Sequence, residues 1–191
     1  MYLDTGEIMD ISPFIRQKYD LKVNNEIERF YDEISYEASL EKGIFLISLK
    51  DRTKKEVRLK LEEKYRNKAA ILRAIEKLEE FGYLNDLNYA MSYIEGRTYG
   101  KNRISYNLFQ KGINKDLVEK AYLTLDEEKE ENVEDVKLEK LIEKKGKKVN
   151  INNERDEKKI KEEQKLIQYL ARQGFSLDKI FKKLKEYKEN Y

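Results

Sequence analysis

Cysteine and histidine are both absent from this chain of 191 residues. Their absence excludes disulfides, thiol nucleophiles, imidazole bases and the common structural zinc sites. A nucleotide-binding GxxxxGK[ST] loop is also missing from the sequence. Catalysis would depend on lysines and carboxylates. No pair of carboxylates stands in an apolar stretch, where the carboxylate pKa would be shifted to a value useful for acid–base catalysis. We therefore expect a protein that is not an enzyme and that holds no cofactor or metal.

Proline and glycine are scarce, with one proline and eight glycines in the chain. Charged residues make up 41% of the sequence and hydrophobic residues 39%. This composition favours long solvated helices over a compact sheet core, so an all-α fold is expected. No apolar run approaches the ~20 residues of a membrane span, and no signal peptide pattern opens the chain. The expected location is therefore the cytoplasm.

The first 32 residues differ in pattern from the rest and are expected to form an N-terminal extension. The turn sequence at residues 4–6 lies between apolar pairs and predicts a short β-hairpin over residues 2–9. A short helix is predicted within residues 12–21, with Ser12 as its cap. Asn25 and Glu28 have the spacing of a capping box, which predicts the start of a long helix from about residue 27.

One pattern of apolar and capping residues occurs three times in the chain. Two apolar positions lie four residues apart; the second is followed after six residues by Asn or Ser, and after ten and fourteen by apolar residues. The three sets are Val57, Leu61, Asn67, Ile71 and Ile75; Ile104, Leu108, Asn114, Val118 and Tyr122; and Leu166, Leu170, Ser176, Ile180 and Leu184. Each set predicts a helix, a tight turn and a second helix that the Asn or Ser caps.

A further helix is predicted ahead of each pair, which makes three three-helix modules. These preceding helices are expected over about residues 33–50, 85–98 and 134–146. The modules are expected at residues 33–84, 85–125 and 126–191. The last one opens with an acidic block over residues 126–135, in a stretch over 125–135 that is expected to be a linker or a frayed helix end, and it has a loop over 146–153. Stacked helical modules form elongated arrays, which commonly bind long partners.

Glycine stands in the predicted turn of the second and third modules, at Gly112 and Gly174. Glycine suits the left-handed conformation in which many helices end. The first module has Tyr65 and Arg66 at this place, so its turn is expected to have a different shape.

Two clusters of mainly basic residues precede or begin the second helix of the first two modules. They are Arg52, Lys54, Lys55 and Arg58 in the first module, and Arg97, Tyr99, Lys101 and Arg103 in the second. Such residues can bind the carboxylates of a protein partner or the phosphates of DNA, and arginine does so with two parallel hydrogen bonds. The alternative is that they are ordinary solvated charges and capping aids. Tyr99 is expected to be exposed, whereas most other tyrosines are expected to pack in the core.

Residues 78–123 combine several short motifs at fixed spacing. They are Gly82-Tyr83-Leu84-Asn85-Asp86, Tyr89-Ala90, Gly100 with Ile104, and Lys111-Gly112-Ile113. This combination resembles the central module of the RecX family of recombination regulators. Residues 49–64 are similar to that family's first module and residues 165–180 to its last. Residues 2–7 with 18–30 are similar to an N-terminal segment of relatives from low-GC Gram-positive bacteria. The chain departs from the family in the turn of its first module and at Glu95-Gly96, where basic residues are more common.

This resemblance implies that the chain regulates RecA, which forms filaments on single-stranded DNA. Members of the family bind along the RecA filament and lower its ATP hydrolysis, strand exchange and coprotease activity. They act in homologous recombination, DNA repair and the SOS response. The implied partners are the RecA filament and single-stranded DNA, and a monomer is implied for a protein that lies in the filament groove.

Two functions of other classes stay open. A stand-alone DNA-binding helical module would bind DNA without RecA and with steep salt dependence. The formal net charge of +2 does not favour that as the main function. An enzyme would need a pocket with perturbed carboxylates, which the sequence does not indicate.

Overall fold

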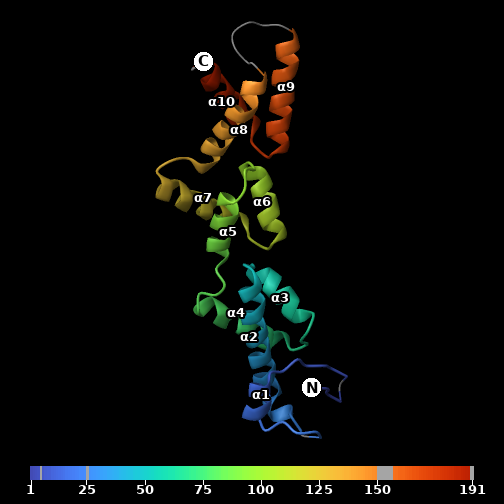
Figure 1. Ribbon diagram of the computed structural model, residues 1–191. Coiled ribbons are helices and arrows are strands. Elements are labelled where there is room, and N and C mark those ends of the chain that lie inside the picture. The colour runs from blue at the N-terminus through green and yellow to red at the C-terminus, as the bar shows by residue number, and fades with distance from the viewer. Residues whose placement is uncertain (5, 25, 150–156, 190–191) are drawn as a thin grey trace. The chain divides into compact units, whose positions relative to one another are not determined.

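The computed structural model is built from α-helices and describes residues 1–4, 6–24, 26–149 and 157–189 (Figure 1). The helices are α1 (Pro13–Lys18), α2 (Tyr31–Leu49), α3 (Lys54–Glu62), α4 (Lys68–Glu80), α5 (Asp86–Glu95), α6 (Lys101–Gln110), α7 (Lys115–Lys129), α8 (Val133–Val149), α9 (Glu157–Arg172) and α10 (Leu177–Glu189). A one-turn 3-10 helix, Glu28–Phe30, leads into α2. The predicted all-α fold is confirmed. None of the described helices has the length and apolar character needed to cross a membrane.

The chain forms two compact units, Met1–Tyr89 and Ala90–Tyr191, and the boundary between them falls inside α5. In the first unit, α2, α3 and α4 pack around one apolar core. Its largest fully buried side chains include Ile34, Leu61, Ile71 and Leu78. In the second unit, α8, α9 and α10 pack around a core of Leu138, Ile142, Leu166, Leu170, Phe175, Ile180 and Leu184. The helices α5, α6 and α7 bury Ile94, Ile104, Leu108, Val118 and Leu125.

The threefold sequence pattern is confirmed at the level of side chains. All twelve apolar residues of the three sets are buried. The three capping side chains accept hydrogen bonds from backbone amides in the first turn of the helix that follows. The Asn67 side chain accepts from the Ala70 amide at 3.0 Å and that of Asn114 from the Leu117 amide at 2.9 Å. Ser176 accepts from the Lys179 amide at 3.4 Å.

The turn between the paired helices has a left-handed glycine in the second and third copies of the pattern and a different shape in the first, as predicted. Gly112 and Gly174 have φ angles of 89° and 93°, which is the left-handed region. Tyr65 occupies the corresponding place in the first unit and is not among the described residues with positive φ. Its amide donates to the Leu61 carbonyl at 2.8 Å, its ring is buried, and its hydroxyl donates to the Asp10 carbonyl at 3.0 Å. A buried aromatic ring thus takes the place of the glycine turn.

The prediction of an N-terminal β-hairpin is wrong. Residues 2 and 8 form a single isolated antiparallel bridge, and the described residues contain no strand. Two-stranded ribbons of this length are marginal alone, and side chains hold the segment instead. The buried carboxylate of Glu7 accepts hydrogen bonds from the Tyr31 hydroxyl at 2.8 Å and from the Arg66 amide at 3.2 Å. Met9 is fully buried in the core of the first unit.

Helix boundaries differ from the prediction at three places. The stretch over residues 125–135, expected to be a linker or a frayed helix end, is mostly helical, because α7 continues to Lys129 and α8 begins at Val133. The carboxylate of Asp126 accepts from the Val133 amide at 2.8 Å and thereby joins the two helices. The expected loop over 146–153 is helical as far as residue 149, and the rest of it lies outside the described residues. Asn25 also lies outside the described residues, and with it the capping box predicted for Asn25 and Glu28. The long helix predicted from about residue 27 is α2, which begins at Tyr31.

Two glycines bring backbones into direct contact inside the second unit. The Gly100 amide donates to the Gln173 carbonyl at 2.9 Å, and the Asn102 amide donates to the Gly174 carbonyl at 3.1 Å. A Cβ atom at Gly100 would lie 2.4 Å from the Gly174 carbonyl carbon, and one at Gly174 would lie 2.6 Å from the Arg103 amide nitrogen. The start of α6 therefore packs on the turn between α9 and α10 without room for a side chain.

Substitution of these glycines should weaken the packing of α6 on the α9–α10 turn. Gly100→Ala is expected to lower the free energy of unfolding by about 2 kcal/mol, because the added methyl group meets backbone that has to move. Gly82→Ala is the matched control: Gly82 has a φ of 72°, and its Cβ would meet nothing within 4 Å. That variant should show only left-handed strain, about 1 kcal/mol. Urea unfolding followed by circular dichroism measures both, and an unchanged Gly100→Ala variant would contradict the contact.

A half-buried lysine joins α8 to the end of α5. The Lys137 ammonium donates to the Ile94 carbonyl, one of the last carbonyls of α5. A cation is favourable at the carboxyl end of a helix. Burial nevertheless lowers the pKa of Lys137 to about 8, with Glu134 and Glu95 acting to raise it and Lys129 to lower it. Lys137 is thus held in its charged form at a cost in solvation.

This lowered pKa predicts a specific dependence of stability on pH. Between about pH 8 and 10.5 the unfolded chain keeps the Lys137 proton and the folded chain loses it, so this group makes the fold more stable as pH rises. Lys137→Met removes that contribution. The stability of the variant relative to the wild type should therefore be greatest at pH 7 and decline towards pH 10. Urea unfolding at these pH values tests this, with Lys140→Met at an exposed position as control; a constant difference for Lys137→Met would refute it.

Candidate functional site

The first basic cluster contains residues that the fold already uses. The Arg52 side chain donates from Nε to the Leu46 carbonyl at 3.1 Å, which fixes it at the end of α2. The Lys54 ammonium pairs with Glu79 of α4 at 2.8 Å. Arg58 is exposed and pairs only loosely with Glu62 on its own helix, at 3.6 Å. Lys55 is exposed as well.

A buried carboxylate completes the amino end of α3. Thr53 and Glu56 form a capping box, in which the Thr53 hydroxyl accepts from the Glu56 amide and the Glu56 carboxylate accepts from the Thr53 amide. The next amide, that of Lys54, donates to Asp86 Oδ1 at 3.0 Å. Burial raises the pKa of Asp86, and the hydrogen bond from Lys54 opposes that rise. The first residue of α5 thus caps α3.

The second basic cluster is built on two contacts between arginine and tyrosine. The Arg103 guanidinium lies 3.9 Å from the ring centroid of Tyr99, and that of Arg97 lies 5.2 Å from the centroid of Tyr93. Arg97 and Arg103 are exposed. Tyr99 is half-buried, so the prediction that it is exposed is wrong. Its ring is covered on one side by Arg103, which also donates to the Gln173 side chain at 3.3 Å.

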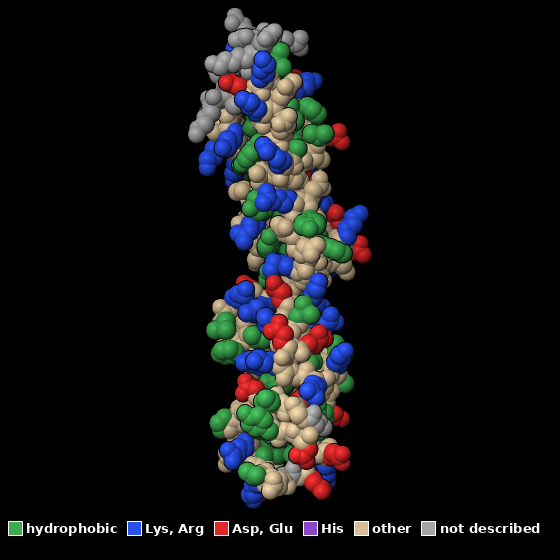
Figure 2. All heavy atoms as spheres, turned by 90° about the vertical axis from the view of Figure 1, so that its right-hand side faces the viewer, with side chains coloured by type: hydrophobic (Ala, Val, Ile, Leu, Met, Phe, Trp, Pro, Cys, Tyr) green, Lys and Arg blue, Asp and Glu red, His purple; other side chains and the backbone are tan. Residues whose placement is uncertain are grey.

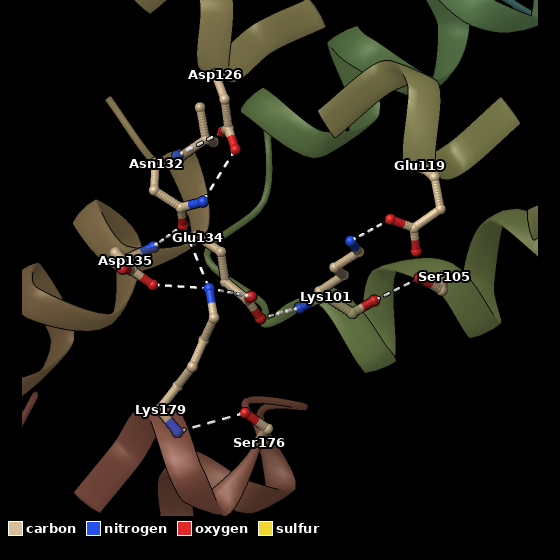
Figure 3. Close-up of polar contacts among 10 residues, drawn as sticks. Lys101, Ser105, Glu119, Asp126, Asn132, Glu134, Asp135, Ser176 and Lys179 are labelled. Atoms are coloured by element: carbon tan, nitrogen blue, oxygen red, sulfur yellow. Dashed lines mark hydrogen bonds and ion pairs between the residues drawn. The ribbon is translucent and has the colours of Figure 1, made fainter. Parts of the chain in front are cut away.

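Lys101 of this cluster also has structural partners (Figure 3). Its ammonium donates to Glu119 of α7 and lies 5.0 Å from the ring centroid of Tyr122. Its backbone amide donates to Glu134 Oε1 at 2.7 Å. This repeats the arrangement of the first unit, because Glu134 of α8 caps α6 as Asp86 of α5 caps α3.

Glu134 connects three helices of the second unit. Its carboxylate is buried, and its Oε2 atom lies 2.9 Å from the Lys179 ammonium of α10. Lys179 also pairs with Asp135 at 2.7 Å, and Figure 3 shows both carboxylates turned towards it. Burial acts to lower the pKa of Lys179, but the hydrogen bonds to Asp135 and Glu134 outweigh it and the pKa is raised. The ammonium therefore stays charged and compensates the buried carboxylate.

The eight predicted site residues thus fall into two groups. Arg52, Lys54, Tyr99 and Lys101 are partly buried and support helix ends or ring contacts. Lys55, Arg58, Arg97 and Arg103 are exposed. The first cluster lies in the first unit and the second in the second unit. Their role in binding stays a prediction.

Sequence reasoning missed two kinds of residue. Asp86 and Glu134 bind amides 32 and 33 residues earlier in the chain, and their only sequence signal is an acidic residue in the first turn of a predicted helix. The sequence pattern groups Tyr106 with the core tyrosines, but 64% of its surface is exposed, as is 66% of Phe109. The signal for these two is their position on the side of α6 opposite to Ile104 and Leu108.

Among the described residues, no three acidic side chains lie together as ligands of one metal ion. A shallow depression of about 280 Å³ on α2 and α4 is lined by Tyr36, Arg73, Glu76, Lys77 and Glu80. Its charged side chains form ion pairs that are exposed to solvent, such as the one between Arg73 and Glu33 at 2.7 Å.

Comparison with known proteins gives consistent matches. The family model described as RecX, second three-helix domain, matches residues 85–121, which include the whole second cluster. The regulatory protein RecX of Clostridium beijerinckii is 30% identical over 185 residues, which cover 93% of this chain and 84% of that protein. The regulatory protein RecX of Clostridium acetobutylicum is 32% identical over 162 residues, which cover 84% and 73% respectively.

A solved structure matches the fold as well. The crystal structure of RecX from Lactobacillus salivarius superposes with a TM-score of 0.66 at 28% sequence identity. The match covers 80% of this chain and 96% of that one.

Removal of the Glu134 carboxylate should destabilise the second unit. Glu134→Ala leaves the Lys101 amide and the Lys179 ammonium without this acceptor and is expected to cost about 1–3 kcal/mol. Glu134→Gln keeps an oxygen for the amide and should cost less. Exposed Glu143→Ala on the same helix is the control. Urea unfolding ranks the three variants, and equal stability of Glu134→Ala and Glu143→Ala would contradict this role.

Proposed function

Because this chain belongs to the RecX family of regulatory proteins, we propose that it regulates RecA. It binds along the RecA filament on single-stranded DNA and inhibits or destabilises that filament. ATP hydrolysis, strand exchange and coprotease activity of RecA fall as a result. The protein acts as a cytoplasmic monomer in recombination, DNA repair and the SOS response, without catalysis of its own.

The observation that carries this proposal is the sequence match to regulatory RecX proteins over 93% of the chain. Exposed guanidinium groups on both units support it. Arg58 lies on the first unit and Arg97 on the second, and neither holds two helices together. Guanidinium groups can pair with carboxylates of a protein filament through two parallel hydrogen bonds. Contacts from both units would let one molecule bind more than one RecA subunit.

The test is RecA-catalysed ATP hydrolysis on single-stranded DNA, titrated with this protein. The wild type should inhibit hydrolysis, and Arg58→Glu with Arg97→Glu should raise the half-inhibitory concentration about tenfold through like-charge repulsion. These two positions are preferred because their side chains are exposed, so the fold should be retained. Arg103 is less suitable because it also contacts Tyr99 and Gln173.

The matched control is Lys120→Glu with Lys182→Glu, which reverses two exposed charges outside both clusters. It should inhibit like the wild type. No inhibition by saturating wild-type protein would contradict the proposed function. Inhibition that is equal for wild type and the Arg58/Arg97 variant would contradict the binding role of these arginines and leave the function standing.

A further inference from the structure

Lys137 of α8 is half-buried and uses a backbone carbonyl as its hydrogen-bond acceptor. That carbonyl belongs to Ile94 near the end of α5, and it also accepts from the Arg97 amide at 3.4 Å. No carboxylate of the described residues forms an ion pair with the Lys137 ammonium. Lys137 therefore loses part of its solvation without gaining a charged partner.

Most other half-buried lysines differ from Lys137 because each is paired with a carboxylate. They are Lys42, Lys54, Lys77, Lys101, Lys179, Lys183 and Lys188. An ion pair favours the charged form of a lysine and keeps it protonated. A partly desolvated ammonium that has only a carbonyl as partner is costly, which favours the neutral amine.

The charges around Lys137 do not cancel the effect of burial. Burial lowers the pKa of Lys137 to about 8; Glu134 of α8 and Glu95 of α5 act to raise it, and Lys129 of α7 acts to lower it. About half of the Lys137 amines are therefore neutral at pH 8, whereas an exposed lysine with a pKa of ~10.4 is less than ~1% neutral there. The neutral amine is the form of lysine that acts as a nucleophile.

We propose that Lys137 is a site of covalent acylation by activated carboxylic acids, namely acyl phosphates or acyl thioesters. The lone pair of the amine attacks the carbonyl carbon of the donor and forms an N–C bond. The bond from that carbon to the phosphate oxygen or the thioester sulfur breaks, and the leaving group keeps the electron pair. The nitrogen gives up one proton to solvent, so the product is a neutral amide.

The amide product fits the position that Lys137 occupies. It keeps one N–H group, which can donate to the Ile94 carbonyl as the ammonium does. It carries no charge, so the cost of desolvating the ammonium disappears. Acylation thus removes a positive charge beside the backbone that leads to Arg97, while the contact between α8 and α5 is kept.

Acylation at exposed lysines is the competing outcome. Lys and Arg side chains cover parts of both units on the face that Figure 2 shows, and a donor reaches exposed lysines more easily. Accessibility and a neutral amine nevertheless depend on pH in different ways. The rate at an exposed lysine should rise up to about pH 10, whereas the rate at Lys137 should level off above about pH 8.

The experiment is incubation of the full chain with acetyl phosphate between about pH 6.5 and 10, followed by mass spectrometry of peptides from cleavage after glutamate. Such cleavage separates Lys137, in residues 135–139, from Lys140, in residues 140–143. At pH 8 Lys137 should react about tenfold or more faster than Lys140, which is exposed on the same helix. Acetyl coenzyme A in place of acetyl phosphate distinguishes the thioester from the acyl phosphate as the donor.

A variant at Lys129 tests the environment of the amine. Lys129→Gln removes a positive charge that lowers the pKa of Lys137 and frees Glu95 from its ion pair with Lys129. Both changes favour the protonated Lys137, so its acetylation at pH 8 should slow about threefold while that of Lys140 stays unchanged. Lys120→Gln, at an exposed position of the same helix α7, is the matched control and should react like the wild type.

Unfolding separates the effect of the fold from that of the local sequence. In urea at a concentration that unfolds the chain, Lys137 and Lys140 should react at equal rates. The inference is overturned if Lys137 of the folded chain reacts no faster than Lys140 at pH 8, or if both rates rise in parallel up to about pH 10. An advantage of Lys137 that persists in urea would overturn it as well. RecA takes no part in this assay, so failure here would leave the proposed function standing.

Discussion

The Glu134 carboxylate lies where α6, α8 and α10 of the second unit meet, and it satisfies groups from two of these helices at once. It accepts the Lys101 amide and pairs with the Lys179 ammonium. A buried carboxylate is tolerated only when it is both hydrogen-bonded and compensated by charge, and here the two requirements are met by different helices. Glu134 thus holds the same end of α6 that packs on the α9–α10 turn through Gly100 and Gly174.

The first unit uses the same principle with a different charge balance. Asp86 accepts the Lys54 amide, as Glu134 accepts that of Lys101. The Lys54 ammonium, however, pairs with Glu79 of α4 rather than with the capping carboxylate. In both units an acidic residue from the first turn of one helix thus completes the amino end of an earlier helix. Such a contact depends on three-dimensional packing. The side chains of the two lysines are engaged elsewhere, because the Lys54 ammonium pairs with Glu79 and the Lys101 ammonium with Glu119.

Local patterns in the sequence are sufficient to predict the helices, their caps and the glycine turns, because these depend on residues within a few positions of each other. The N-terminal hairpin is predicted wrongly because its pairing is limited to one bridge between residues 2 and 8, while Glu7 and Met9 are held by α2 and by the core. Of the two possibilities for residues 125–135, a linker and a frayed helix end, the second is nearer, because α7 continues to Lys129 and Asp126 accepts the Val133 amide of α8. The expectation that most tyrosines pack in the core fails for Tyr106, because it lies two positions from both Ile104 and Leu108 and so on the other side of α6. The sequence identifies the two basic clusters as groups of residues. Only the burial of each side chain in the structure shows which of them support helix ends and which are exposed on the surface.

The contact between Gly100 and Gly174 consists of backbone alone. The contact therefore does not depend on the identity of the side chains around it, and neighbouring residues can be substituted without weakening it. For the same reason, neither glycine can be replaced by a larger residue without disturbing the contact. When two side chains collide, a smaller residue on one side can compensate for a larger one on the other. Glycine has no side chain that could be shortened. A larger residue at Gly100 or Gly174 therefore cannot be compensated by a substitution of the other glycine.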